Sequence, residues 1–122
     1  MTTISPRTRL QRWLAGNGAL LAAGAVALAA YASHGVDGGA QSRLQTAALF
    51  AFGHGVALVA LAPQADAWPK RSALLSIYAG TVLFAGSIVL SVLAQWPTTF
   101  APLGGLLLIG GWLLMAFDAM RR

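Results

Sequence analysis

The stretch that decides the fold is Leu44 to Ala62, LQTAALFAFGHGVALVALA, an uncharged apolar run that carries His54 between two glycines near its middle. As an α-helix its 19 residues would rise about 28 Å, close to the hydrocarbon thickness of a bilayer. The run therefore predicts a membrane-crossing helix. Because polar groups at that depth usually face other helices, we expect His54 to face the third or the first helix and not lipid.

The composition excludes a soluble domain. Hydrophobic residues make up 57% of the 122 residues and charged residues 9%, against roughly 25% charged residues in soluble domains. The formal charge of +5 does not predict nucleic-acid binding, since the basic clusters border apolar runs and form no stripe with interleaved aromatic residues. No cysteine is present, so disulfides and cysteine metal sites are excluded.

We expect one transmembrane domain, residues 13–118, folded as an all-α, antiparallel four-helix bundle because the connections are short. Residues 1–12 would form a cytoplasmic N-terminal tail and residues 119–122 a cytoplasmic C-terminal tail. Gly38 and Gly39 are expected to break the chain between the first two helices. The expected helices span about residues 13–33, 44–62, 72–95 and 100–117.

The basic residues predict the orientation. Seven of the eight Lys and Arg residues flank the side that would carry both termini, and Arg43 alone lies on the other side. Because Lys and Arg are retained in the cytoplasm, we expect both termini there. A signal peptide cleaved after Ala32 is the competing interpretation of the N-terminal segment, but the apolar run of about 20 residues exceeds the usual length of 7 to 15.

Small residues recur at helical spacing along the apolar runs. In lipid, such residues allow two helices to approach closely. The candidate helix-packing positions are Ala47, Ala51, Gly55, Ser76, Gly80, Gly86, Gly104, Gly105, Gly110 and Gly111.

Three polar residues are candidates for function: His54, His34 and Ser87. His54 is either a proton relay, a haem or metal ligand or a ligand contact, or else a structural residue bonded to a neighbouring helix. His34, followed by Gly35, fits a helix C-terminal cap. Two histidines without cysteine or an intramembrane carboxylate fall short of a metal site, and we expect no catalytic, cofactor or metal residues.

The three aspartates lie at the expected helix boundaries, where solvated or headgroup-level charges are usual. Asp118 and Arg121 are three residues apart, so we expect a weak surface pair between them.

The second helix centred on His54 and four short segments carry a family resemblance; the segments are Ala30 to Gly35, Gly80 to Ser87, Pro102 to Gly105 and Gly110 to Leu113. In this order they resemble the domain-of-unknown-function 423 family, which includes proteins similar to transmembrane protein 256. The resemblance runs from about residue 24 to residue 115. It implies four helices in a bacterial inner membrane or a mitochondrial setting, and no established reaction. The family tends to have tyrosine and glutamine where this chain has Phe50 and Ala51.

The small-residue stripes and the lack of a catalytic constellation favour a non-enzymatic accessory or structural subunit of a larger membrane complex. The expected partners are the lipid bilayer and other membrane subunits or further copies of the chain. The alternative is a small oligomeric transporter or permeation module that uses His54. A membrane enzyme or redox-cofactor carrier is the third hypothesis.

Overall fold

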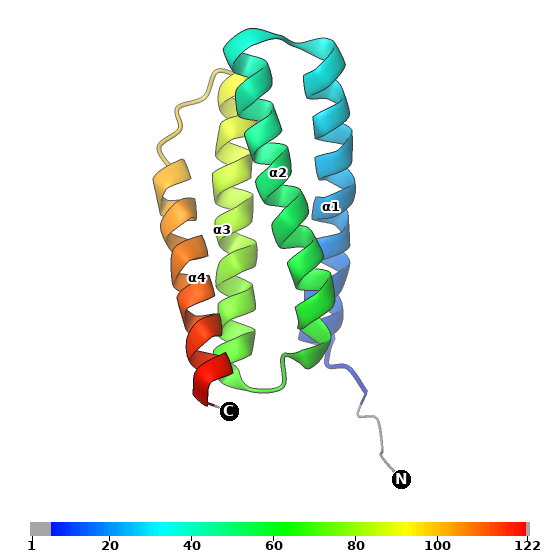
Figure 1. Ribbon diagram of the computed structural model, residues 1–122, viewed down its shortest axis with the longest axis vertical. Helices are drawn as coiled ribbons and strands as arrows, with labels where there is room; N and C mark the ends of the chain where they lie inside the picture. The colour runs from blue at the N-terminus through cyan, green and yellow to red at the C-terminus, as the bar shows by residue number, and fades with distance from the viewer. Residues whose placement is uncertain (1–5, 122) are drawn as a thin grey trace.

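Residues 6–121, the part of the chain that the computed structural model describes, form four antiparallel α-helices (Figure 1). Each is long and apolar enough to cross a membrane, which confirms the expected all-α membrane bundle. Arg9 and Arg121 lie at one end of the bundle, here called the terminal end, and the opposite end is called the distal end. The helices are α1 (Arg9–Gly35), α2 (Gly38–Leu61), α3 (Trp68–Leu93) and α4 (Ala101–Arg121), with a 3-10 turn η1 (Ala62–Gln64) after α2.

The first helix begins inside the expected N-terminal tail because a capping box starts it. The Gln11 N–H donates to Thr8 Oγ1 at 3.2 Å, and the Thr8 N–H donates to Gln11 Oε1 at 2.7 Å. Such reciprocal bonds satisfy two donors that a helix start leaves open. Gln11 Nε2 also donates to the Ala65 carbonyl at 3.1 Å, which ties α1 to the turn after η1. The part of the expected tail at residues 1–5 lies outside the described residues.

The two glycines expected to break the chain instead begin the second helix. Gly38 has φ +65 and is the first residue of α2, so the connection from α1 consists only of Val36 and Asp37. Glycine adopts positive φ without steric cost, and one such residue suffices for the reversal. Because α2 starts six residues earlier than expected, at Gly38, His54 lies not at its middle but seven residues from Leu61, about 10 Å along the axis.

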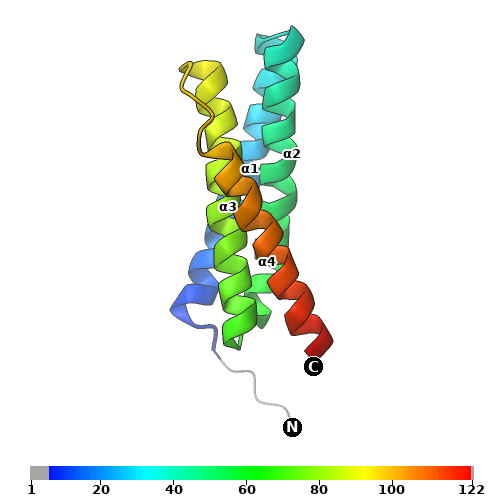
Figure 2. The same cartoon turned by 90° about the vertical axis from the view of Figure 1, so that its left-hand side faces the viewer.

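The fourth helix is displaced toward the terminal end. It extends to Arg121, so residues 119–121 are helical and not a tail, and Arg122 lies outside the described residues. Gly80 of α3 lies opposite Gly104 of α4. The distal third of α3 therefore has no α4 beside it, and the α3–α4 loop descends along it (Figure 2).

The helices pack as two hairpins, α1–α2 and α3–α4, joined mainly through α2 and α3. Within residues 6–121, the backbone of α4 approaches no helix other than α3. A core of larger side chains fills the terminal half, and a core of alanines fills the distal half. The larger side chains include Leu14, Leu58, Leu74, Ile77 and Leu108, and the alanines are Ala25, Ala47, Ala51 and Ala85.

A histidine-centred groove as the candidate functional site

His54 uses both ring nitrogens in hydrogen bonds. Its Nδ1 lies 2.8 Å from the Phe50 carbonyl, one turn earlier on α2, and its Nε2 lies 3.0 Å from Nε1 of Trp112 on α4. A carbonyl only accepts and an indole N–H only donates. Nδ1 therefore carries the proton, Nε2 accepts, and the ring is a neutral imidazole in one defined tautomer.

The His54–Trp112 bond crosses a groove between α2 and α4. The cavity there measures about 530 Å³, and it exists because the backbones of these two helices do not meet within the described chain. Aromatic rings form one wall: Phe84 contacts Phe50 with ring centroids 4.6 Å apart, and Phe50 stacks on His54 at 5.8 Å. The remaining lining comes from α4: Gly105, Leu108, Ile109, Trp112 and Leu113.

The partner of His54 differs from the expected one. We expected the ring to face the third or the first helix, but it bonds to Trp112 of the fourth. The reason is the residue that follows His54 in the chain. Gly55 packs against Gly18 of α1, and successive residues of an α-helix are rotated by about 100° around its axis. The His54 side chain therefore points away from α1. Trp112 was not among the sequence candidates. Its signal was an indole N–H in an apolar helix, which needs an acceptor.

The three candidate polar residues are not brought together. His34 is exposed at the distal end of α1, whereas His54 lies in the terminal half. Gly35 was expected just beyond the helix, but it is the last residue of α1, and the C-cap is Val36 in an extended conformation. Ser87 lines a separate cavity of about 310 Å³ beneath the α3–α4 loop. Among residues 6–121, no three His, Cys, Asp or Glu side chains are close enough to hold a metal ion.

The candidate packing positions fall into two groups. Ala47 and Ala51 are buried, and Ser76 Oγ donates to the Leu107 carbonyl at 2.7 Å. A Cβ added to any of four glycines would lie within 3.0 Å of atoms on a facing helix; these are Gly55, Gly80, Gly104 and Gly111. At the other three glycines, an added Cβ would have no such heavy atom of the described chain within 4 Å; these are Gly86, Gly105 and Gly110.

Asp118 is buried, contrary to the expectation of a solvated boundary charge. Its Oδ1 accepts from Arg121 Nη2 at 2.9 Å, and its Oδ2 lies 3.9 Å from Nζ of Lys70. The carboxylate is enclosed because the last turns of α4 lie beside the first turn of α3. The positive end of the α3 dipole also favours a negative charge there. Asp118 thus links α4 to α3 at the terminal end.

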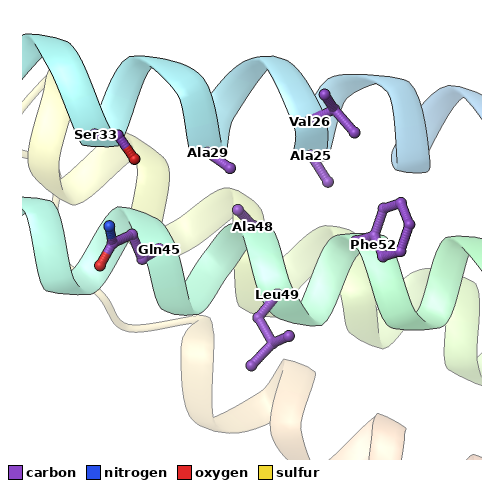
Figure 3. Close-up of a pocket in the computed structure, with 8 residues that line it drawn as sticks. All are labelled: Ala25, Val26, Ala29, Ser33, Gln45, Ala48, Leu49 and Phe52. Atoms are coloured by element: carbon purple, nitrogen blue, oxygen red, sulfur yellow. The ribbon is translucent and has the colours of Figure 1, made fainter.

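A further cavity of about 380 Å³ lies between α1 and α2 in the distal half. Figure 3 shows the alanines of both helices facing the gap, with a serine and a glutamine toward one end. Small side chains leave this space open. Ser33 and Gln45 are the two polar residues of its lining, so few groups in it can form hydrogen bonds. Its lining residues are Ala25, Val26, Ala29, Ser33, Gln45, Ala48, Leu49 and Phe52.

Comparisons with known proteins bear on the family alone. A family model described as "Protein of unknown function (DUF423)" matches residues 28–105, more than half of the chain. The match includes His54 and the three glycines Gly55, Gly80 and Gly104. Comparison with curated proteins and with solved structures gives no match.

Proposed function

Since this chain belongs to the DUF423 family of proteins of unknown function, we propose a role based on its own surface. It is a non-enzymatic integral membrane subunit that packs against a larger membrane complex through the outer face of α1. The family match and the apolar helices support the membrane setting. The composition of the α1 face, described next, supports the docking role.

The outer face of α1 is made largely of glycine and alanine. At Gly16 and Gly24, two turns apart, an added Cβ would meet no heavy atom of the described residues within 4 Å, apart from the helix's own backbone. Leu20 between them is 70% exposed. The exposed small residues of this face are Gly16, Ala19, Ala23, Gly24, Ala27 and Ala30.

The outer face of α4 has the opposite composition. Its exposed side chains are mostly large, and the small residues among them are Gly110, Ala116 and Ala119. Large aliphatic side chains suit contact with acyl chains, whereas small ones allow a second helix to approach closely. The contrast favours α1 as the helix that meets protein and α4 as the helix that meets lipid. The large residues of the α4 face are Leu103, Leu106, Ile109, Leu113, Phe117 and Met120.

The charges support the proposed orientation. Arg9, Arg12, Lys70, Arg71 and Arg121 gather at the terminal end (Figure 1), and Arg43 belongs to the first turns of α2 at the distal end. By the retention of basic residues in the cytoplasm, we assign the terminal end to the cytoplasmic side of a bacterial inner membrane.

The test is gentle native extraction followed by mass spectrometry, with Gly24→Leu compared to Gly110→Leu. Both glycines are open, so neither leucine should disturb the bundle. We expect larger subunits to accompany the wild type and Gly110→Leu, and to be lost with Gly24→Leu. Recovery of the same partners with both variants would contradict the proposal, as would recovery of the wild type alone or only with further copies of itself.

The alternative, an oligomeric transporter or permeation module, is supported by His54 alone. Ser87 lines another cavity, and the hydroxyls of Ser76 and Thr81 donate to the backbone carbonyls of Leu107 and Ile77. A continuous polar path would need further residues beside His54. Unchanged flux of ions and solutes in a His54→Ala variant would count against this alternative.

A further inference from the structure

The groove between α2 and α4 offers one hydrogen-bond acceptor opposite one donor. His54 Nε2 accepts and Trp112 Nε1–H donates, and in the described structure they satisfy each other at 3.0 Å. The His54 tautomer is fixed from behind by the Phe50 carbonyl. A hydroxyl both donates and accepts at a single oxygen atom, so it can insert between these two nitrogens and replace one hydrogen bond by two.

The walls of the groove favour a flat ring beside that hydroxyl. Phe84, Phe50 and His54 form a continuous series of ring contacts, and Trp112 extends it with its centroid 5.9 Å from that of His54. Aromatic rings prefer offset-stacked or edge-to-face partners. Gly105 on the facing helix presents no side chain, and its Cβ position has no heavy atom of the described chain, other than its own helix, within 4 Å.

The groove can open without breaking the bundle. The backbone of α4 is held by α3 alone among the described helices, and the Trp112 side chain is 40% exposed. A modest swing of the indole therefore makes room for a ligand oxygen. The only titratable side chain among the groove residues is His54 itself, so a neutral ligand fits better than a charged one.

From these features we propose that the groove binds a membrane-soluble phenol, that is, a hydroxylated aromatic ring of the kind carried by lipid-soluble quinols. The ring lies between Phe50, Phe84 and the backbone at Gly105. The hydroxyl donates to His54 Nε2 and accepts from Trp112 Nε1–H. The apolar tail leaves the groove past Ile109 and Leu113 toward lipid. This site is distinct from the outer face of α1.

The test uses the full chain in detergent micelles, with ¹⁵N-labelled tryptophan and 4-butylphenol as the probe. The four tryptophan indoles report four regions, and Trp112→Phe identifies the resonance of Trp112. We expect 4-butylphenol to shift this resonance saturably while the other three move little. The methyl ether 4-butylanisole, which lacks the donor, should bind at least about tenfold more weakly, because Nε2 is then left without its donor.

Variants sharpen the result. His54→Phe keeps the aromatic wall and removes the acceptor, so phenol binding should fall by about tenfold or more, whereas His34→Phe at the distal end should change nothing. Equal binding of phenol and anisole to the unmodified chain would reduce the groove to an apolar cavity that acyl chains fill, and would overturn the proposal. Parallel, non-saturating shifts of all four indoles would overturn it as well. Neither outcome requires that a variant folds.

Discussion

In the α1–α2 hairpin, Gly18 and Gly55 face each other so closely that a Cβ on Gly55 would lie 2.6 Å from the Gly18 carbonyl oxygen. In the α3–α4 hairpin, Gly80 and Gly104 also face each other, and a Cβ on Gly80 would lie 2.7 Å from the Gly104 carbonyl oxygen. Both crossings are reciprocal, since each glycine of a pair faces the other's carbonyl. The same backbone contact therefore holds each pair of helices.

Beyond the crossing, the hairpins differ. The α1–α2 connection is two residues long, whereas α3 and α4 are joined by residues 94–100 and are staggered. The staggered hairpin has the Asp118 link, and its outer helix bears large side chains. The tight hairpin exposes glycine and alanine on α1. A glycine crossing thus fixes which helices pair, while the outer residues determine what each hairpin meets in the membrane.

The largest effect on stability should come from adding a methyl group at the glycines where the paired helices cross. Gly55→Ala and Gly80→Ala each place a Cβ under 3.0 Å from backbone atoms of the facing helix, so the hairpin must separate. We expect each to lower the free energy of unfolding by about 2 kcal/mol, measured by denaturation in mixed micelles.

The matched controls are Gly53→Ala on α2 and Gly86→Ala on α3, where an added Cβ meets nothing of the described structure within 4 Å besides its own helix. Their effect should stay within about 0.5 kcal/mol. Equal losses of unfolding free energy in all four variants would show that the close glycine contacts do not contribute specifically to stability.

A smaller effect, confined to the staggered hairpin, should follow from Asp118→Asn. Removing one member of a buried pair costs about 3–5 kcal/mol when both charges are enclosed. The Arg121 side chain is 38% exposed and regains water, so we expect a loss of about 1–2 kcal/mol. The same unfolding assay measures it. Asp37→Asn, at an exposed N-cap without a side-chain cap bond, should leave stability unchanged, and a comparable loss there would contradict a specific link at Asp118.

The smallest effect concerns the longer connection. Gln95 has φ 56 just after α3, a left-handed conformation that costs a non-glycine residue about 1 kcal/mol or more. Gln95→Gly should therefore raise the free energy of unfolding by about 0.5–1 kcal/mol. Ala94→Gly, at φ −121, should give no gain. If both glycines stabilise equally, the strain at Gln95 is not the cause.

The sequence was sufficient for the architecture because lipid imposes length and polarity on each spanning helix. Charge-free runs around His54 and after Arg71 predicted helices that the structure contains. The family resemblance is confirmed over residues 28–105. The ends of the helices were less predictable. Gly38 shows why: a glycine can end a helix or begin one, and the residue type alone does not say which; here Gly38 is the first residue of α2.

The site was harder to predict than the fold. The sequence singled out His54 but not Trp112, because the stagger of α4 decides which residue lies at the level of the histidine. Asp118 was misjudged for the same reason, since its burial depends on α4 extending beside Lys70. Spacing within one helix cannot give the register between two helices.

The most direct test of the α1 docking face uses the absence of native cysteine. Single cysteines are placed at Ala23 on α1 and at Ala116 on α4, both exposed alanines. Each variant is coupled to a short photo-crosslinker in its native membrane. We expect discrete protein adducts from Ala23→Cys and none from Ala116→Cys. Adducts of equal yield from both positions, or none from Ala23→Cys, would contradict the assignment of α1 to protein and α4 to lipid.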